Sequence, residues 1–521
     1  MIRKRSSSID ESIVIDLPPT SLPKPCIPFR YFVMFMIFSC TMIGYSVKSV
    51  INVAILAMVD NSNETSDSLV ARHWLGKFRS SGQFEQSQTF NWNQYDQALV
   101  LGGYFYTFTA SQLIGGVITD KSNIVILMSL TQAFAAICTL ASPIAASISI
   151  YCLIAVRALT GLAHGVMLPS CFNLAEHWFP PGEISLVQSL IAVGCNSGTA
   201  ITLTLTAWLC QSNLWGGWPS AFIIIGIVNL GYAVIFYLTM SNDPQSSRLT
   251  SKWEKSYLSK VVVNKVTTKK LKTPWISLFT SLPLWSIFWV RGLSGLAYYT
   301  INTKIPVYLE QILHYDITNN GLINSSFYVV IALAQLITGP LAKLIILKKW
   351  LPRTLTRKIF ESFILLGLVI GLTLITYLGD KPTLAVITLI VTMFFYGFDS
   401  GGDAPMVPEM APNLVGTAFG FANTMRCASG FIAPALIGFI IGDDVNSFSL
   451  IDISLSLILF FCFQIKSESK WFLTFHIISG LQIIALIIFL VFATAEPLPW
   501  ATINSDTEDE EVDGETIVNA G

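Results

Sequence analysis

The sequence predicts an all-α membrane protein with about twelve transmembrane helices in two six-helix bundles. Of its 521 residues, 53% are hydrophobic and only 12% are charged, whereas a soluble domain usually carries about twice that charged fraction. The mean hydropathy is +0.61, and the apolar residues gather in runs of about 20, long enough to cross a hydrocarbon layer of about 30 Å. A short repeat shared by two of these runs divides the chain into halves. A soluble enzyme, a secreted disulfide scaffold and a disordered chain are excluded.

Charge and cysteine usage exclude further classes. The 31 Lys and Arg residues balance the 32 Asp and Glu residues, for a net charge of -1, so we expect no nucleic-acid partner. Most of the nine cysteines lie inside apolar runs and none forms a CxxC pair, which argues against a zinc site and a disulfide framework. The chain shows no phosphate loop, nucleotide motif or nucleophile triad at a usable spacing. We expect no enzymatic activity, no cofactor and no metal.

Apolar runs define the expected helices, because lipid cannot satisfy the hydrogen bonds of an open backbone. Residues 29–240 are expected to form the N-terminal bundle and residues 277–495 the C-terminal bundle. The expected spans are 29–59, 97–119, 122–144, 148–174, 184–209, 219–240, 277–302, 321–346, 359–378, 382–411, 414–442 and 471–495.

The polar segments predict the orientation in the membrane. Residues 1–28 and the acidic segment 496–521 are expected to be disordered tails. Lys and Arg concentrate on the cytoplasmic side of membrane proteins, and the loop 241–276 is strongly basic, so we expect this loop and both tails to be cytoplasmic. The long loop 60–96 then faces the exterior or a lumen. It contains Asn63-Glu64-Thr65, an N-glycosylation acceptor that works only on that side.

A repeat points to the architecture of the two halves. Ser111–Gly116 (SQLIGG) in the second span matches Ala334–Gly339 (AQLITG) in the eighth, 223 residues later. A parallel six-plus-six repeat is the plan of major-facilitator transporters, in which substrate binds between the halves near the midplane. The small residues of the repeat permit close helix packing. We expect the protein to act as a monomer in the bilayer.

Short motifs occur along nearly the whole chain between residues 30 and 501. They are Val53–Val59, Phe90–Trp92, Gln112 with Gly115-Gly116, Arg157–Gly161, Gly165, Pro169, Trp178–Pro181, Glu183, Pro306–Tyr308, Ala411-Pro412 and Glu496–Trp500. Together they resemble the anion:cation symporters of the major facilitator superfamily, which include sialin, vesicular glutamate transporters and sodium–phosphate cotransporters. The resemblance implies cotransport of small organic anions or phosphate, coupled to protons, sodium or membrane potential, across a plasma, lysosomal or vesicular membrane.

Two cations in the N-terminal half are candidates for binding the anion. A charge at the bilayer centre costs at least about 2.5–3.5 kcal/mol, so each one needs a partner or a function. Arg157 stands where the family has an arginine and offers a forked, charge-assisted contact; its alternative is a structural salt bridge. Lys48 stands where the family commonly has arginine, and its alternative is snorkelling to the interface.

His164 lies two turns along the same helix face as Arg157. The family usually has glutamate at this position and often another at Thr160, and both acids are missing here. Because histidine titrates near neutral pH, one interpretation makes His164 the site of the coupling proton. The other makes it a neutral, hydrogen-bonded residue with no part in coupling.

The C-terminal half contributes a second group of candidates. Arg291 falls where sialin-like members have histidine, and Tyr299 matches a tyrosine of the family. Together with Asn302, these residues are expected to contact the substrate. Aromatic packing is the alternative for Tyr299 and, more strongly, for Tyr298.

The tenth span carries acids that depart from the family pattern. Asp399 and Asp403 are four residues apart and so share a helix face. Either acid takes over the coupling role, or Asp403 forms a structural pair with a basic group. The family shows Asn-His where this chain has Met406-Val407. Helix–helix hydrogen bonding is the default expectation for Gln112, Gln335, Asn196, Asn423 and Arg426.

Residues 445–464 form an insert relative to the family pattern. Its apolar part, Phe448–Phe463, is short for a span and includes Asp452. A crossing here would place the acidic tail outside. The alternative is a short intron translated in frame.

These features predict a secondary active transporter of small anions that works by alternating access. Two other classes stay open at this point. A membrane receptor or scaffold could keep the fold without transporting, and an anion channel would conduct without saturating.

Overall fold

The computed structural model describes most of the chain and is almost entirely helical. The described residues are 25, 27–59, 89–92, 94–212, 214–261, 273–311, 317–378, 381–441 and 467–501. Most of the expected tails, the glycosylation acceptor Asn63 and the insert 445–464 lie outside them. The prediction of a tail that is disordered from residue 496 is wrong at its start, because Leu498 N donates to Met410 O at 2.9 Å and Ala501 is buried. A single parallel bridge joins Val59 to Phe90 in the described part.

Helices account for every expected span of the N-terminal half. One break was not predicted: the expected span 148–174 consists of two helices separated at Gly165 and Val166. The helices of this half are α1 (Phe29–Met58), α3 (Gln94–Lys121), α4 (Ile124–Ile148), α5 (Ile150–His164), α6 (Met167–Trp178), α7 (Pro181–Gln211), the short η2 (Leu214–Gly216) and α8 (Trp218–Thr239).

The C-terminal half repeats the pattern and has a break of its own. The expected span 382–411 is interrupted near Gly401 and Gly402, between a 3-10 turn and a short helix. The helices are α10 (Trp275–Thr280), α11 (Leu282–Gln311), α12 (Ile317–Leu347), α13 (Arg353–Ile375), α14 (Pro382–Tyr396), η3 (Gly397–Ser400), α15 (Asp403–Met410), α16 (Val415–Ile441), α18 (Ser467–Phe492) and η5 (Pro499–Ala501).

Local sequence chemistry sets several helix starts. Asn123 Oδ1 accepts a hydrogen bond from Ile126 N at 3.0 Å, and Ser149 Oγ accepts one from Cys152 N at 3.1 Å, so both residues cap helices. Pro181 and Pro382 stand at the first positions of α7 and α14, where a missing N–H costs nothing.

The basic loop between the halves contains a helix that hydropathy did not predict. This helix, α9 (Lys252–Val261), packs against the start of α1. The buried Glu254 carboxylate accepts hydrogen bonds from Phe29 N at 2.7 Å and from Arg30 N at 3.1 Å, which places negative charge at a helix N-terminus. We call this end of the molecule the α9 end. The opposite end, where Val59 meets Phe90, is the far end.

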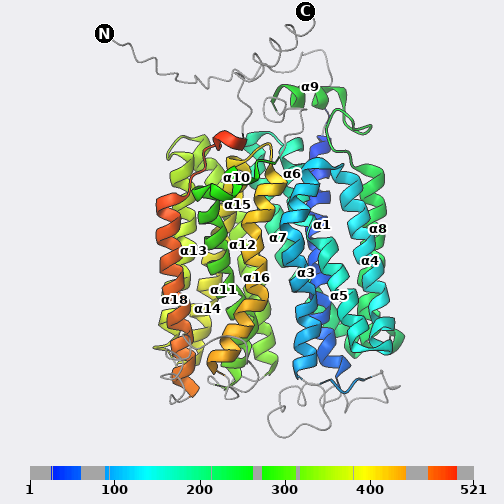
Figure 1. The fold of residues 1–521 in the computed structure, drawn as a ribbon, viewed down its shortest axis with the longest axis vertical. Coiled ribbons are helices and arrows are strands. Elements are labelled where there is room, and N and C mark those ends of the chain that lie inside the picture. The colour runs from blue at the N-terminus through cyan, green and yellow to red at the C-terminus, as the bar shows by residue number, and fades with distance from the viewer. Residues whose placement is uncertain are drawn as a thin grey trace, which may run out of the picture.

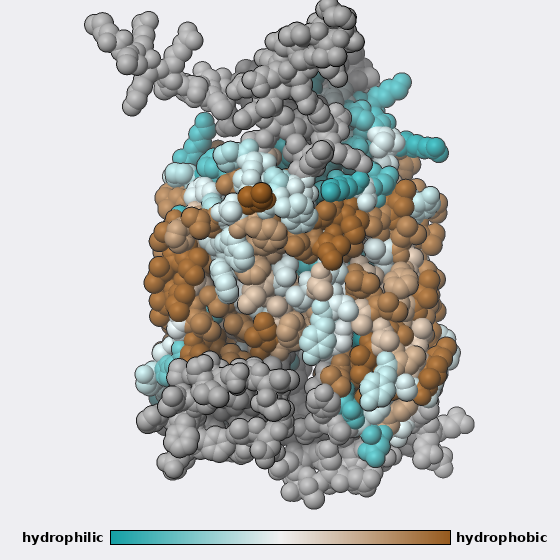
Figure 2. Space-filling model, viewed as in Figure 1, coloured by the Kyte–Doolittle hydropathy of each residue, from teal (hydrophilic) through white to brown (hydrophobic). Residues whose placement is uncertain are grey.

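The helices form two groups that stand side by side. Figure 1 shows the N-terminal half on the right and the C-terminal half on the left, with α9 above them. Apolar side chains cover much of the face shown in Figure 2 between the two ends of the molecule, while polar residues gather near the α9 end. Nine of the described helical segments are long and apolar enough to span a bilayer. The spans outside that set, α3, α11 and α16, pack against one another at the centre.

The halves meet along two helix pairs, which we call the α3–α16 seam and the α7–α12 seam. The two copies of the repeated hexapeptide lie one on each seam. A side chain on Gly116 would collide with the Gly416 carbonyl, and one on Gly339 would collide with Ser189. The small residues of the repeat therefore allow the two halves to approach closely.

Candidate functional site

Lys48 lies between the two halves inside a group of aromatic rings. Its Nζ is 4.8 Å from the ring centroids of Tyr45 and Phe105, 5.8 Å from Tyr299 and 6.0 Å from Phe108. Tyr299 belongs to the C-terminal half and the other three rings to the N-terminal half. Within the described residues, Lys48 forms no ion pair with an acid. Its charge is held by the negative faces of aromatic rings, each worth about 0.5–2 kcal/mol.

Arg157 is buried next to Lys48 and binds backbone rather than an acid. Its Nη1 donates to Val47 O at 3.3 Å and its Nη2 donates to Lys48 O at 3.1 Å. The guanidinium carbon lies 5.2 Å from the Tyr104 ring centroid, and Nε has no partner among the described residues. Arg157 therefore forms no salt bridge with an acid in the described residues. Both of its terminal nitrogens already donate to carbonyls, so they are not free to make a forked contact with an anion. Arg157 ties α5 to α1 at Lys48 and adds a positive charge there.

His164 is buried beside the same tyrosine. Its Nδ1 is hydrogen-bonded to Tyr104 Oη at 3.1 Å, and only 1% of the residue is exposed. Lys48 and Arg157 both lie within electrostatic range of the ring. The contact with Tyr104 fits the hydrogen-bonded interpretation. Coupling through His164 stays an untested prediction.

Arg426 brings a C-terminal cation to the same region. Its charge interacts with Lys48 and with Cys195, which Lys48 also faces. Its guanidinium lies over the Tyr396 ring at 5.6 Å, and Nη1 is 3.9 Å from Asp399 Oδ2. The Arg426 side chain is 27% exposed, so part of this cation stays open between the halves.

Asp399 belongs to a chain of polar contacts that crosses the α7–α12 seam. Gln335 Nε2 donates to Asp399 Oδ1 at 3.0 Å, and Asn196 Nδ2 donates to Gln335 Oε1 at 3.0 Å. On the other seam, Asn423 Nδ2 donates to Gln112 Oε1 at 3.3 Å. The default expectation of helix–helix hydrogen bonds for these four amides is met.

Arg291 and Asp403 form a buried ion pair, with side-chain exposures of 3% and 4%. The Arg291 guanidinium also lies 4.8 Å from the Phe419 ring centroid. Glu361 Oε2 accepts a hydrogen bond from Asp403 N at 3.1 Å, so a second carboxyl stands beside the pair. Pairing of Asp403 with a basic group was one of the two expectations. Arg291 does not join the rings around Lys48, and its predicted contact with substrate stays untested.

The aromatic residues of α11 line the boundary between the halves. Tyr299 packs edge-on against Phe105 of α3, with ring centroids 5.8 Å apart. Tyr298 stacks on Tyr396 at 4.8 Å, as the packing alternative expected. The half-buried Asn302 donates from Nδ2 to Tyr298 O at 2.7 Å. Tyr299 is thus the α11 residue of this group that reaches Lys48.

The halves are joined tightly at the α9 end. Asp120 of α3 accepts hydrogen bonds from Gly416 N at 2.9 Å, Thr417 N at 2.7 Å and Thr417 Oγ1 at 2.6 Å, and so caps α16 of the other half. Arg357 of α13 pairs with Glu409 at 2.7 Å and donates to Ser185 Oγ of α7 at 3.3 Å. Charge-assisted bonds therefore fasten the α3–α16 seam and join α13 to α7 at this end.

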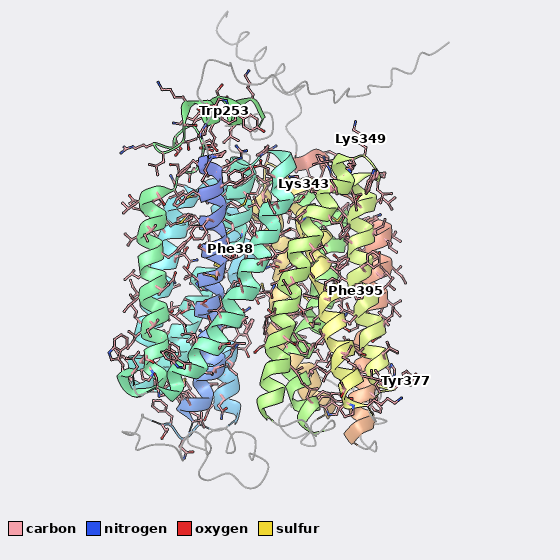
Figure 3. All side chains as sticks on the ribbon, turned by 180° about the vertical axis from the view of Figure 1, so that it is seen from behind. Phe38, Trp253, Lys343, Lys349, Tyr377 and Phe395 are labelled. Carbon is pink, nitrogen blue, oxygen red and sulfur yellow. The ribbon has the colours of Figure 1, made fainter. Side chains whose placement is uncertain are left out.

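Two polar side chains on one face of α1 differ in exposure. Lys48 is half-buried, and Asn52, one turn further along the same face of α1, is exposed. Figure 3 shows the ribbons of α7 and α12 close together near Lys343 and diverging toward the end marked by Tyr377. A polar, exposed Asn52 inside an apolar helix points to a water-accessible approach from the far end.

Several residues of the central network were not among the predicted site residues. Arg357 and Glu361 are charged positions near the start of the expected span 359–378, and a charge inside an apolar run was their available signal. Arg426 was assigned only to helix packing. Within the described residues no group of His, Cys, Asp and Glu is arranged to hold a metal ion.

The fold and the central cations define a membrane transporter. The sequence profile of the Major Facilitator Superfamily matches residues 34–434, and the chain belongs to this superfamily. The proton:xylose symporter XylE, in a structure bound to 6-bromo-6-deoxy-D-glucose, superposes with a TM-score of 0.64 over 90% of this chain and 98% of its own, at 12% identity. That likeness confirms the predicted fold.

Curated relatives narrow the family. Sialin of Ovis aries is 27% identical over 497 residues, covering 94% of this chain and 95% of its own. Vesicular glutamate transporter 2 of Homo sapiens is 24% identical, covering 93% and 77%. A putative inorganic phosphate cotransporter of Drosophila melanogaster is 24% identical, covering 93% and 89%. These matches confirm the predicted resemblance to the anion:cation symporters.

Proposed function

We propose that the protein is a secondary active transporter of small organic anions or phosphate and that the anion binds at Lys48 between the halves. The observation that carries this proposal is the charge balance around Lys48. Lys48 and Arg157 are both cationic, and neither pairs with an acid in the described part of the chain. An anion entering this space supplies the missing countercharge.

The geometry supports a division of labour among the cations. Lys48 is half-buried and its ammonium has three donors, so it makes the direct contact with the anion. Arg157 uses two of its donors on carbonyls of α1 and acts on the anion chiefly through its field, while Arg426 approaches from the other half. Tyr299 and Asn302 provide polar contacts on the α11 side.

The conformation supports alternating access. The contacts of Asp120 and Arg357 close the α9 end, and the exposure of Asn52 opens the far end. The basic loop lies at the α9 end, so the rule that positive residues stay inside makes this end cytoplasmic. This orientation places both termini in the cytoplasm and Asn63 on the outer or luminal side of a plasma, lysosomal or vesicular membrane. The transporter acts as a monomer coupled to protons, sodium or membrane potential.

Counterflow in proteoliposomes tests the proposal. Vesicles loaded with L-glutamate, inorganic phosphate or D-glucuronate receive the labelled anion outside, and a carrier shows saturable, trans-stimulated uptake of at least one of them. No exchange of any small anion would favour a scaffold or receptor, and a non-saturating conductance would favour a channel. Imposed proton and sodium gradients then identify the coupling ion.

Lys48→Met is the informative variant. Methionine keeps the length and the apolar stem but removes the charge. A charge-assisted contact contributes about 1.5–3 kcal/mol, so we expect anion affinity to fall about 10- to 100-fold. Lys349→Met, on an exposed turn at the α9 end (Figure 3), is the matched control and leaves affinity unchanged. Equal affinities in the two variants would remove Lys48 from the site.

A further inference from the structure

The Arg426–Asp399 pair differs from the other arginine–carboxylate pairs of the C-terminal half. Arg426 Nη1 lies 3.9 Å from Asp399 Oδ2, whereas direct pairs of this kind usually measure about 2.7–2.9 Å. Arg357 pairs with Glu409 at 2.7 Å, with the arginine side chain 1% exposed. Arg426 is 27% exposed. The cation of the loose pair is therefore accessible and only partly committed to its acid.

Asp399 is held from its other side. Its Oδ1 accepts the hydrogen bond from Gln335, and Gln335 in turn accepts one from Asn196 of the N-terminal half. The Asp399 carboxylate thus contacts both the partly exposed Arg426 and the hydrogen-bonded amides that cross the α7–α12 seam. A change of charge on Asp399 affects its attraction to Arg426 and the strength of its hydrogen bond with Gln335.

We propose that Asp399 and the transported anion compete for Arg426, and that a proton bound by Asp399 releases Arg426 to the anion. This inference rests on the proposed function, because it assigns a coupling residue to the same site. It makes protons the coupling ion. Arg426 becomes an anion-binding residue that the sequence analysis assigned only to helix packing.

The charges balance through the cycle. With the site empty, the Asp399 carboxylate neutralises Arg426. A proton from the solution on the entry side converts that carboxylate to a neutral carboxyl, and the anion then takes its place as the counterion of Arg426. Release on the other side reverses both steps: the anion leaves, the carboxyl returns its proton to water, and the pair forms again. One proton accompanies each negative charge that Arg426 binds.

Groups on every neighbouring element face Asp399. They are Asp403 of α15, Glu361 of α13, Tyr396 of α14, Cys195 of α7, Arg291 of α11 and Arg426 of α16, with the uncharged Gln335 on α12. Asp403 is bound directly to Arg291, and both are buried. Glu361 is also buried, beside Asp403, at 2% exposure. Asp399 is the carboxyl of this group whose arginine partner reaches the space between the halves.

Proton binding also loosens the seam. A carboxylate accepts a stronger hydrogen bond from Gln335 than a neutral carboxyl does. Protonation therefore weakens the link from Asp399 through Gln335 to Asn196. Protonation of Asp399 therefore both allows the anion to bind Arg426 and loosens the α7–α12 seam, and alternating access requires that these two changes be linked.

The pH dependence of anion affinity in Asp399→Asn tests the proposal. The probe is whichever of L-glutamate, inorganic phosphate and D-glucuronate the wild type exchanges, measured at about pH 5.5 and about pH 7.5. We expect the wild type to bind at least about tenfold more tightly at the lower pH. In Asp399→Asn we expect the same high affinity at both values, retained counterflow and no proton-driven accumulation. Asp243→Asn, which removes one exposed carboxylate on the segment between α8 and α9, is the control and keeps the pH dependence of the wild type.

Two further measurements complete the test. Arg426→Gln is expected to lower anion affinity at the lower pH about tenfold or more and to bring it close to the value at the higher pH. In weakly buffered solution, the wild type is expected to take up about one proton for each singly charged anion it binds, and this readout needs no variant to fold. Counterflow in Asp399→Asn with the pH dependence of the wild type, or anion binding without proton uptake, would overturn the inference. A wild type that exchanges none of the probes would instead overturn the proposed function.

Discussion

The cations within the membrane-spanning helices have different partners in the two halves of the molecule. In the N-terminal half, Lys48 is surrounded by rings and Arg157 binds carbonyls of α1, and neither pairs with an acid in the described residues. In the C-terminal half, Arg291, Arg357 and Arg426 each face a carboxylate. The comparison teaches that, among the described residues, the N-terminal half leaves these two cations without a carboxylate, whereas the C-terminal half balances these three arginines with acids.

This asymmetry follows from the cost of burying charge. A buried cation without a counterion needs other polar partners, which the N-terminal half provides through carbonyl oxygens and ring faces. These partners leave a net positive charge and hence an attraction for anions. The C-terminal half neutralises the charges of these three arginines internally, so the pairs hold its helices together.

The largest effect that separates the halves is expected from Arg291→Gln. It leaves the Asp403 carboxylate buried beside Glu361 with no cation, and loss of one partner of a buried pair costs about 3–5 kcal/mol. Thermal unfolding of the purified protein in detergent measures the loss. The double variant Arg291→Gln/Asp403→Asn is expected to recover most of it, because the uncompensated charge is gone. A double variant no more stable than the single one would show that the pair is not an isolated ionic unit.

The sequence predicts those features that depend only on the order of apolar and polar residues along the chain. The expected spans coincide with described helices, and nine of the described helical segments are recognised by length and apolarity alone. The breaks at Gly165 and at Gly401-Gly402 were not predicted, since hydropathy does not register a change of backbone direction in an apolar run. The docking of α9 on α1 was also not predicted, because it depends on Glu254 meeting a helix start 224 residues away.

Individual site residues were predictable as charges in apolar runs, but their partners were not. Arg157 and Lys48 were predicted to bind the anion and lie next to each other in the structure, while their contact with an anion stays a prediction. That Arg157 binds α1 carbonyls depends on how α5 packs on α1, which spacing in one chain does not reveal. The same limit explains why Arg426 was assigned to helix packing, since its exposure and its loose contact with Asp399 exist only in three dimensions.

An intermediate effect is expected from Arg157→Gln, the matching change in the N-terminal half. The substitution leaves no buried acid without its cation. The carbonyls of Val47 and Lys48 lose charged hydrogen-bond donors, so we expect the free energy of unfolding to fall by about 1–3 kcal/mol. Anion affinity falls as well, because the field at Lys48 weakens and α1 is less firmly placed. Unfolding and anion-binding titrations on one preparation measure both. A stability loss as large as that of Arg291→Gln would refute the proposed difference between the halves.

The smallest effect is expected from a change at Gln112, the glutamine of the first copy of the repeat. Gln112 donates to no partner within the described residues, and its Oε1 accepts a 3.3 Å bond from Asn423, which also contacts Cys427 Sγ at 3.3 Å. Gln112→Leu therefore removes one weak bond together with an unpartnered amide. We expect a stability change within about 0.5 kcal/mol.

Gln335→Leu is the counterpart on the α7–α12 seam. It takes a donor from the Asp399 carboxylate and an acceptor from Asn196, so about 1–3 kcal/mol is expected. It also breaks the link from Asp399 to the N-terminal half while leaving Arg426 in place. Anion affinity should then keep its pH dependence, whereas the rate of exchange changes because the seam has lost its bond. Equal effects of the two leucine variants on stability and exchange would mean that the seams are equivalent and that Asp399 exerts no control across them.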